Sequence, residues 1–237
     1  MATAKHLGIA VIGFLATSAS ISTPTRATSL PPAEGTAKAR LNGSPRHAEL
    51  ATVDVRGTPV RVWVVYPERK DAAPAVIVIH EIFGLTDWIR AVADQLAADG
   101  FIAVAPDLLS GKGPGGGGTD AYPSRDDVTK AVSGLARDEV IARLDAVRDW
   151  ALARPAANGK SASLGFCWGG STSFAWAVAQ PDVTIQVWDK VLPVRARTGT
   201  PEDKRRVWPI MTAQWPAYDE YQAGSRRNIP VVLLTPR

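Results

Sequence analysis

The residue with the clearest capacity for covalent chemistry is Cys167, the only cysteine among the 237 residues. It stands in the run Gly165-Phe166-Cys167-Trp168-Gly169, after a stretch typical of a strand and before one typical of a helix. A nucleophile between small residues at such a junction matches the nucleophile elbow, in which strand turns into helix within one residue. Glycine is needed because larger side chains do not fit beside the turn. The pattern therefore predicts a cysteine nucleophile.

A position at the start of a helix would also support the reactivity of this thiol. The helix dipole and the free N–H groups of the first turn favour a thiolate. The N–H group of Trp168 would point toward the oxyanion that forms when a carbonyl is attacked. A buried structural cysteine is the alternative interpretation of the same residues. A lone cysteine excludes an internal disulfide, but composition does not choose between these two interpretations.

The elements that must position Cys167 alternate between strand and helix. Apolar and β-branched runs predict strands, of which the first two form a hairpin, over 47–56, 59–66, 73–79, 101–105 and 160–166. Helical spacing of apolar residues predicts helices over 128–135, 138–153 and 169–180, and a further helix that Thr86 caps at its start and Gly100 ends. This alternation indicates the α/β class, with a mostly parallel central sheet covered by helices on both faces.

In such a sheet, ligand sites lie at the carboxyl ends of the strands. Three segments meet at that edge: the run His80-Glu81-Ile82-Phe83-Gly84, the loop that begins at Pro106-Asp107, and the cysteine corner. The loop continues to Arg125 and contains four successive glycines. We therefore expect the chemistry of the chain to lie where these three segments converge.

No cofactor or metal is expected from the motifs. The run from Gly111 to Gly116 has the spacing GxGxxG, but it lies in a long loop rather than in a turn that opens a helix. The sequence has no GxxxxGK[ST] motif and no pair of histidines at metal-ligand spacing.

Composition also bears on the kind of partner. The net charge is +4 and the isoelectric point is near 9.4, but the basic residues are scattered rather than grouped in blocks. Because no nucleic-acid-binding motif accompanies them, we expect a small-molecule ligand and no nucleic acid. The oligomeric state stays open.

The first 27 residues have the layout of a secretory signal peptide, with a basic start, the apolar run Leu7–Ala16 and a small-residue end. The apolar run is too short for a permanent membrane anchor. We expect export to a periplasm or out of the cell, cleavage after Ala19 or Ala27, and no stable membrane insertion once the signal is removed. Residues 28–45 are rich in Pro, Ala, Gly and Ser, which predicts a flexible lead-in.

Three motifs together resemble the dienelactone hydrolases, also called carboxymethylenebutenolidases, of the α/β-hydrolase fold. They are Val78–Leu85, Ala105–Leu108 and Gly165–Gly170. Each motif is weak by itself, but the three in this order at compatible spacing are specific. The resemblance covers residues 46–180, and it implies an α/β-hydrolase-like core that acts on an ester or lactone.

The resemblance also implies roles for individual residues. Cys167 matches the nucleophile, which attacks the carbonyl and forms an acyl-enzyme that water releases. Glu81 matches the glutamate that contacts the resting cysteine and helps to convert it to thiolate. The backbone N–H groups of Ile82 and Trp168 match the oxyanion hole. Arg125 is a candidate for binding an anionic substrate by its location alone, and a solvated loop arginine is the alternative interpretation.

The chain departs from the family pattern after the nucleophile. In this fold an Asp or Glu and then a His follow the nucleophile along the chain, but the only histidines are His6, His47 and His80. We expect His80 to be a satisfied polar residue at a strand end rather than a proton-transfer group. Loss of a triad member costs orders of magnitude in rate, so the activity of this chain is in doubt.

Residues 181–237, here called the tail, do not match the family. Prolines and charged runs interrupt them, and only Ile229–Thr235 is typical of a strand. The tail is either an authentic, divergent cap or partner-binding segment, or the product of a reading frame that shifted near Pro181 and ended early. We prefer the frame shift.

Three hypotheses on function follow. The first is an exported hydrolase of esters or lactones with Cys167 as its nucleophile. The second is a non-catalytic α/β-hydrolase-like protein that keeps the binding pocket without a triad. The third is an unrelated secreted α/β domain with a structural cysteine. The sequence does not specify the substrate.

Overall fold

The computed structural model describes residues 7–9, 32–180, 182–187, 190–214, 216–225 and 228–236. The strands are β1 (Leu7–Ile9), β2 (Ala48–Val55), β3 (Thr58–Val65), β4 (Ala73–Ile79), β5 (Ile102–Pro106), β6 (Ala157–Gly165), β7 (Asp182–Val187), β8 (Lys190–Thr198) and β9 (Val232–Pro236). The helices are α1 (Glu34–Asn42), α2 (Asp87–Ala98), α3 (Arg125–Ser133), α4 (Arg137–Leu152), α5 (Trp168–Ala179), α6 (Pro201–Gln214) and α7 (Ala217–Gly224).

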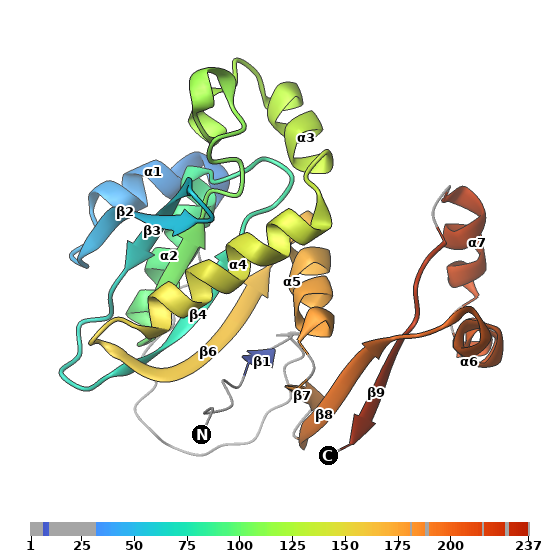
Figure 1. The fold of residues 1–237 in the computed structure, drawn as a ribbon. Helices are drawn as coiled ribbons and strands as arrows, with labels where there is room; N and C mark the ends of the chain where they lie inside the picture. Colours follow the sequence, from blue (N-terminus) through green and yellow to red (C-terminus); the bar gives the residue numbers. More distant parts are fainter. Residues whose placement is uncertain are drawn as a thin grey trace.

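All the described strands belong to one sheet, in the order β2-β3-β5-β4-β6-β1-β7-β8-β9 (Figure 1). The central strands β5, β4, β6, β1 and β7 are parallel, whereas β2 and β3 at one end and β8 and β9 at the other pair antiparallel. The α/β class and the α/β-hydrolase-like core are confirmed. The antiparallel ends make the whole sheet mixed, with a parallel centre.

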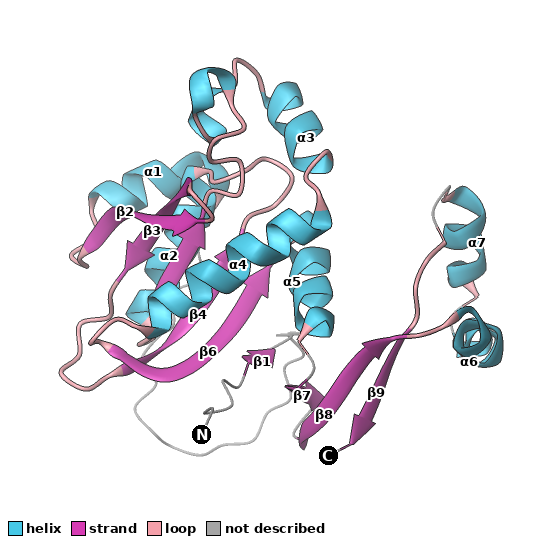
Figure 2. Ribbon diagram, viewed as in Figure 1, coloured by secondary structure: helices cyan, strands magenta, loops and turns pink. Residues whose placement is uncertain are grey.

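Helices cover both faces of the sheet, as expected for parallel strands (Figure 2). Helix α4 and Trp176 of α5 pack on one face, in a core cluster that includes Ile77 and Val104. Helix α2 packs on the other face, in a cluster that includes Val76 and Val78. Because neighbouring residues of β4 point to opposite faces, its unbroken apolar run serves both clusters.

The predicted hairpin is confirmed, since β2 pairs antiparallel with β3 along its whole length. The turn residues Arg56 and Gly57 have φ of 54° and 82°. Two successive positive φ values are the mark of the tight hairpin turn that matches strand twist. The predicted N-cap of α2 is also confirmed, because the Thr86 side chain accepts a hydrogen bond from the N–H of Ile89.

The glycine-rich segment after β5 ends sooner than predicted. Helix α3 begins at Arg125, whereas the sequence placed Arg125 in the loop and the helix start at Val128. The Ser124 side chain caps the helix by accepting a hydrogen bond from the N–H of Asp127 at 3.2 Å. Acidic residues in the first turn interact favourably with the helix dipole, so the polar start of α3 is a helix terminus and not a loop.

The tail is more regular than its prolines suggested. It forms β7, β8, α6, α7 and β9, and the antiparallel strands with their two helices extend to one side of the core (Figure 1). Pro201 begins α6, where a missing N–H costs nothing. Pro193 lies outside the part of β8 that pairs with β9, so its missing N–H affects one ladder at most. Pro209 lies inside α6, and the expectation that it breaks the helix is wrong.

The structure tests only part of what the sequence predicts for residues 1–45. Helix α1 lies within the stretch that composition predicted to be a flexible lead-in, and its Ala37 is fully buried. Of the predicted signal peptide, only Leu7–Ile9 is described, as the strand β1 between β6 and β7. The signal peptide and export therefore stay predictions. Among the described residues, no helix combines the length and apolar character that crossing a membrane requires.

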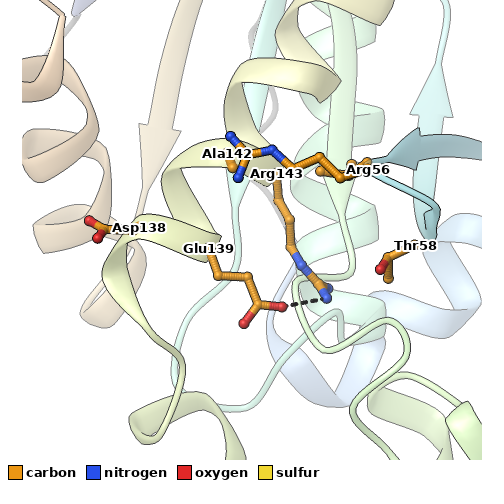
Figure 3. Close-up of a pocket in the computed structure, with 7 residues that line it drawn as sticks. Arg56, Thr58, Asp138, Glu139, Ala142 and Arg143 are labelled. Carbon is orange, nitrogen blue, oxygen red and sulfur yellow. Dashed lines mark hydrogen bonds and ion pairs between the residues drawn. The ribbon is translucent and has the colours of Figure 1, made fainter.

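A buried arginine fixes the chain where it leaves β5. Arg143 of α4 is 2% exposed, and its guanidinium donates to the carbonyl oxygens of Leu108 at 3.0 Å and Ser110 at 2.8 Å. It also donates to Glu139 at 2.8 Å, beside a cavity of about 280 Å³ at the hairpin turn (Figure 3). Glu139 in turn binds Lys112 at 2.9 Å. Helix α4 therefore holds the start of the loop that leaves the sheet edge after β5.

This arrangement generates a stability prediction. Replacing Arg143 by Met keeps the apolar stem but leaves two buried carbonyl groups without donors, which should lower the free energy of unfolding by about 3 kcal/mol. Urea unfolding followed by circular dichroism measures the change. The matched control is Arg137→Met on the same helix, which is exposed and should change the free energy by less than about 0.5 kcal/mol. Equal effects of the two substitutions would contradict the role given to Arg143.

Candidate active site

Cys167 lies on a strained turn between β6 and α5. It is the N-cap residue of α5, with φ of 52° and ψ of −119°. Among the described residues, Arg56 and Cys167 alone have positive φ without being glycine. Such a conformation costs free energy and persists where the surrounding structure imposes it, often at functional sites. Cys167 is exposed, so the alternative of a buried structural cysteine is wrong.

Two glycines make this turn possible. A Cβ on Gly165 would lie 2.2 Å from the carbonyl oxygen of Gly169. A Cβ on Gly169 would lie 2.3 Å from the carbonyl oxygen of Ile79 and 2.4 Å from that of His80. The obstructing atoms are all backbone, which cannot move aside as a side chain can. The start of α5 is therefore packed directly against the ends of β6 and β4, and only glycine allows this approach.

The strand register brings Glu81 to the same edge. Ile79 of β4 pairs with Gly165 of β6, so Glu81 and Cys167 each stand two residues beyond a paired position. Partial burial raises the pKa of Glu81, the charge of Glu34 raises it further, and Arg125 opposes the increase. A carboxylate with a raised pKa accepts a proton more readily, which suits a group that deprotonates a thiol.

The two predicted oxyanion donors lie on the segments that meet here. The N–H group of Trp168 belongs to the first turn of α5, where helical N–H groups have no intrahelical acceptor. Within the described part of the chain, the N–H group of Ile82 makes no hydrogen bond. The side chains of Ile82 and Trp168 pack in one cluster with Leu109, Val128 and Val132. Both donors are thus available, and apolar packing holds their segments together.

His80 is fully buried beneath this edge. Its ring stacks on Trp168 with centroids 5.5 Å apart and an interplanar angle of 14°. Its Nδ1 lies 2.7 Å from the carbonyl oxygen of Glu81, and because a carbonyl only accepts, Nδ1 carries the proton. Burial lowers the pKa of His80, whereas the hydrogen bond to the Glu81 carbonyl and the charge of Asp107 act in the opposite direction. His80 is therefore a neutral ring that supports Trp168 and the Glu81 backbone.

Only one nitrogen of His80 is satisfied. Its Nε2 is buried without a hydrogen-bond partner among the described residues. The expectation of a satisfied polar residue at a strand end therefore holds for Nδ1 alone.

A buried carboxylate ties the glycine-rich loop to this site. Asp107 accepts hydrogen bonds from the N–H group of Thr119 at 2.8 Å and from its hydroxyl at 2.7 Å. The same hydroxyl accepts from the N–H of Leu85 at 3.1 Å. Gly84 has φ of 73°, and a Cβ there would lie 2.4 Å from the Thr119 hydroxyl oxygen. The segment that carries Glu81 and Ile82 is therefore anchored at its far end by Asp107 through Thr119.

Arg125 lies at the rim of this region. Its guanidinium carbon stands 3.9 Å from the centroid of the Phe83 ring, and it forms an ion pair with Glu34 of α1. Arg125 and Glu34 both lie near Glu81, because the charge of Glu34 raises the pKa of Glu81 and the charge of Arg125 lowers it. The structure thus brings Arg125 to the candidate site, already engaged by a carboxylate and an aromatic ring.

Sequence reasoning missed two residues that position the site, Thr119 and Arg143. Arg143 stands beside the apolar positions Val140 and Leu144, and a charge next to a buried stripe was a usable signal. Thr119 had no such signal, because its role depends on how a glycine-rich loop folds back. Within the described part of the chain, no group of three or more His, Cys, Asp or Glu side chains could hold a metal ion.

The glycine contacts generate the first prediction for the site. Gly169→Ala should lower the free energy of unfolding by about 3 kcal/mol, because the new methyl group overlaps the Ile79 carbonyl. Chemical denaturation measures the change. Gly35→Ala in α1 is the matched control, since nothing lies within 4 Å of its added Cβ, and it should be neutral or stabilising. A Gly169→Ala protein as stable as the wild type would show that the packing differs from that described here.

The buried histidine generates the second prediction. Because the pKa of His80 is lowered in the folded protein, the unfolded chain binds the proton more strongly, and acid favours unfolding. Stability from this residue is complete above a pH of about 6.5 and should fall by about 1 kcal/mol per pH unit below it. Urea unfolding at several pH values measures this slope.

The contribution of His80 is isolated by substitution. His80→Gln should flatten the acid limb of the stability profile, whereas His47→Gln, at a largely exposed position, should leave it unchanged. An unaltered acid limb in His80→Gln would contradict a neutral, buried ring.

Comparison with known proteins assigns the core of the chain to a family. Residues 60–188 match the model of the family described as "Dienelactone hydrolase family". A second family model, described as "F420H(2)-dependent quinone reductase", matches residues 170–236. The two matches overlap in α5 and β7. The tail thus has a likeness of its own, to a family other than that of the core.

Individual relatives agree with the first match. A Salmonella typhi protein named "Putative carboxymethylenebutenolidase" is 30% identical over 145 residues, which are 59% of this chain and 51% of that protein. "Carboxymethylenebutenolidase 1" of Cupriavidus pinatubonensis is 32% identical over 105 residues, 44% of this chain and 45% of that protein. The chain therefore spans about half the length of the curated relatives it matches.

A solved structure shows the same relationship. The crystal structure titled as a "Putative Dienelactone Hydrolase" from Klebsiella pneumoniae aligns with a TM-score of 0.51 and 31% identity. The alignment covers 57% of this chain and 56% of that one. Since the family match over 60–188 takes in more than half of the residues and contains Glu81, His80 and the Cys167 elbow, this chain belongs to the dienelactone hydrolase family.

Proposed function

We propose that this protein cleaves carboxylic esters or lactones through a thioester on Cys167. The observation that supports this most directly is the exposed cysteine held at positive φ at the start of α5. Such a turn is costly and serves no packing purpose for an exposed side chain, whereas it suits a nucleophile that must reach a bound carbonyl. The membership in a hydrolase family supports the same reaction class.

The acylation step uses the groups gathered at the sheet edge. The thiol proton passes to Glu81, and the sulfur forms a bond to the acyl carbon, whose carbonyl oxygen takes the negative charge. The N–H groups of Ile82 and Trp168 bind that oxyanion. When the tetrahedral intermediate collapses, the carbon–oxygen ester bond breaks, and the leaving alkoxide recovers the proton from Glu81. The product of this half-reaction is an alcohol and a thioester.

Release of the acyl group is the weaker half of the reaction. Water must attack the thioester, and a histidine base normally assists it in this fold. No histidine follows Cys167 in this sequence. His80 is fully buried, and its unprotonated Nε2 has no exposed surface, so it is poorly placed to activate a water molecule that enters from solvent. We therefore expect fast acylation and slow deacylation.

This difference in rates generates a kinetic prediction. With p-nitrophenyl acetate, the protein should release about one equivalent of p-nitrophenol in a burst, followed by turnover that is slower by orders of magnitude. Stopped-flow absorbance measures the burst, and intact mass spectrometry should find the acetyl group on Cys167. Cys167→Ala should show neither.

The outcomes separate the competing functions. A burst without steady turnover supports a nucleophile that deacylates slowly. Thiol labelling of Cys167 without any burst supports the non-catalytic binding protein, and the absence of a later histidine is the observation that favours it. A burst that persists in Cys167→Ala would exclude Cys167 as the nucleophile.

The role of Glu81 generates a second kinetic prediction. Glu81→Gln removes the proton acceptor without changing the size of the side chain, and it should slow the burst by about 100-fold at pH 7. The matched control is Glu68→Gln, at an exposed loop position, which should leave the burst rate unchanged. A burst of normal rate in Glu81→Gln would show that solvent, and not Glu81, takes the thiol proton.

Export and a substrate carboxylate bound by Arg125 are further parts of this proposal. Arg125 supports an anionic substrate only if its ion pair with Glu34 opens or is shared, since that carboxylate already neutralises it. Export rests on the layout of residues 1–27 alone.

The likeness of the tail to F420H(2)-dependent quinone reductases invites a second function, which the tail's geometry does not favour. Cofactor sites are concave and mostly apolar, whereas none of the described residues of α6 and α7 is buried. The described residues of these helices therefore do not form an enclosed site for a large cofactor. The frame shift stays a prediction, and the match of the tail in its own frame argues for an authentic segment.

A further inference from the structure

The His80 ring donates a hydrogen bond to the peptide group that carries one of the two proposed oxyanion donors. Its Nδ1 lies 2.7 Å from the carbonyl oxygen of Glu81. That carbonyl group and the N–H group of Ile82 belong to the same peptide unit. Because a trans peptide unit is planar, its C=O and N–H groups point in opposite directions. The hydrogen bond from His80 therefore also fixes the direction of the Ile82 N–H group.

The Glu81 carbonyl group points toward the interior, because the ring that it meets is fully buried. The Ile82 N–H group therefore points away from that ring, and none of the described residues accepts a hydrogen bond from it. A free N–H group at the sheet edge that carries Cys167 is what an oxyanion requires. The Glu81 carbonyl also accepts from the N–H group of Gly84 at 3.2 Å. His80 thus supplies the shorter of the two hydrogen bonds that hold this peptide.

The polar character of His80 needs an explanation, since packing alone does not require it. An aromatic hydrocarbon ring would stack on Trp168 and fill the same space without burying a polar atom. His80 instead buries Nε2 with no hydrogen-bond partner in the described part of the chain, at a cost of about 1–3 kcal/mol. What His80 provides beyond such a ring is the hydrogen bond from Nδ1 to the Glu81 carbonyl. Its ring also stacks on Trp168, which carries the second proposed donor.

We propose that His80 is a positioning residue for acylation, whose Nδ1–H group holds the Glu81–Ile82 peptide so that the Ile82 N–H group faces the acyl oxygen. This inference rests on the proposed function, because an oxyanion forms only if Cys167 attacks a carbonyl. His80 itself touches neither the substrate nor the reacting atoms. Without its hydrogen bond, the planar peptide can rotate about the line that joins its two Cα atoms. Such a rotation turns the N–H group away but leaves both Cα atoms, and the Glu81 side chain, in place.

Two substitutions in the full chain separate the hydrogen bond from the ring. His80→Phe keeps a flat ring against Trp168 and removes the donor. His80→Asn removes the ring but keeps a donor, because the amide nitrogen of asparagine lies two bonds from Cβ, as Nδ1 does. With p-nitrophenyl acetate, His80→Phe should slow the burst by about tenfold, less than the loss of a whole oxyanion donor, because the Gly84 bond remains. The burst rate of His80→Asn should stay within about threefold of the wild type.

Alkylation of Cys167 by iodoacetamide is the readout that distinguishes this role from a merely structural one. In that reaction the thiolate displaces iodide from a saturated carbon, so a carbon–sulfur bond forms without an oxyanion. A distorted elbow or a displaced Glu81 would slow alkylation and the burst together. His80→Phe should instead be alkylated within about twofold of the wild-type rate, measured by intact mass spectrometry, while its burst is slow. His47→Phe, at a largely exposed position, is the matched control and should change neither rate.

A burst of wild-type rate in His80→Phe would overturn this inference and leave the proposed function intact. Equal slowing of the burst and of alkylation would also overturn it, since His80 would then support the thiol or the fold and not the oxyanion. If His80→Phe does not fold, His80→Asn decides, because a burst as slow as that expected for His80→Phe would show that the retained donor is not what matters. A wild-type protein without any burst would overturn the proposed function, and the role of His80 with it.

Discussion

The backbone contact between the start of α5 and the end of β4 sets the geometry of the whole site. Gly169 lies so close to the carbonyl groups of Ile79 and His80 that a single methyl group would overlap both. This contact forces the chain to turn at Cys167 within one residue, which is why a non-glycine residue holds positive φ there. The exposure of the thiol and the position of the first-turn N–H groups follow from this contact, at the edge of the sheet that also carries Glu81.

Two sets of buried polar bonds keep the loops above the sheet in place around that contact. Asp107 and Thr119 anchor the segment that follows β4, and Arg143 holds the segment that follows β5. Each uses a charged group in the interior to satisfy backbone atoms, which are expensive to leave unpaired. His80 adds a third support by donating to the Glu81 carbonyl while it stacks on Trp168. The loops are therefore fixed by the core and not only by their own sequence.

The fold, and the turn on which the candidate nucleophile lies, could be predicted from sequence because their signals are local. Short stretches of sequence predict their own local structure: the apolar runs predict β4 and β5, Thr86 predicts the start of α2, and the glycines predict the turn at Cys167. The tail could not be predicted in the same way, since Pro193 and Pro201 fall at positions where a missing N–H is harmless, which only the pairing reveals. Thr119 and the Arg143 contacts join residues far apart in sequence, so no local pattern marks them.

The Trp168 indole links the interior of the protein to the edge of the sheet. The same residue carries the N–H group proposed as an oxyanion donor, stacks on a buried ring and packs with Ile82, Leu109 and Val132. A substitution beneath the indole would therefore tilt the donor without touching any ligand. Because close-packed interiors transmit small displacements, the shape of the interior beneath the indole and the direction of this N–H group are coupled.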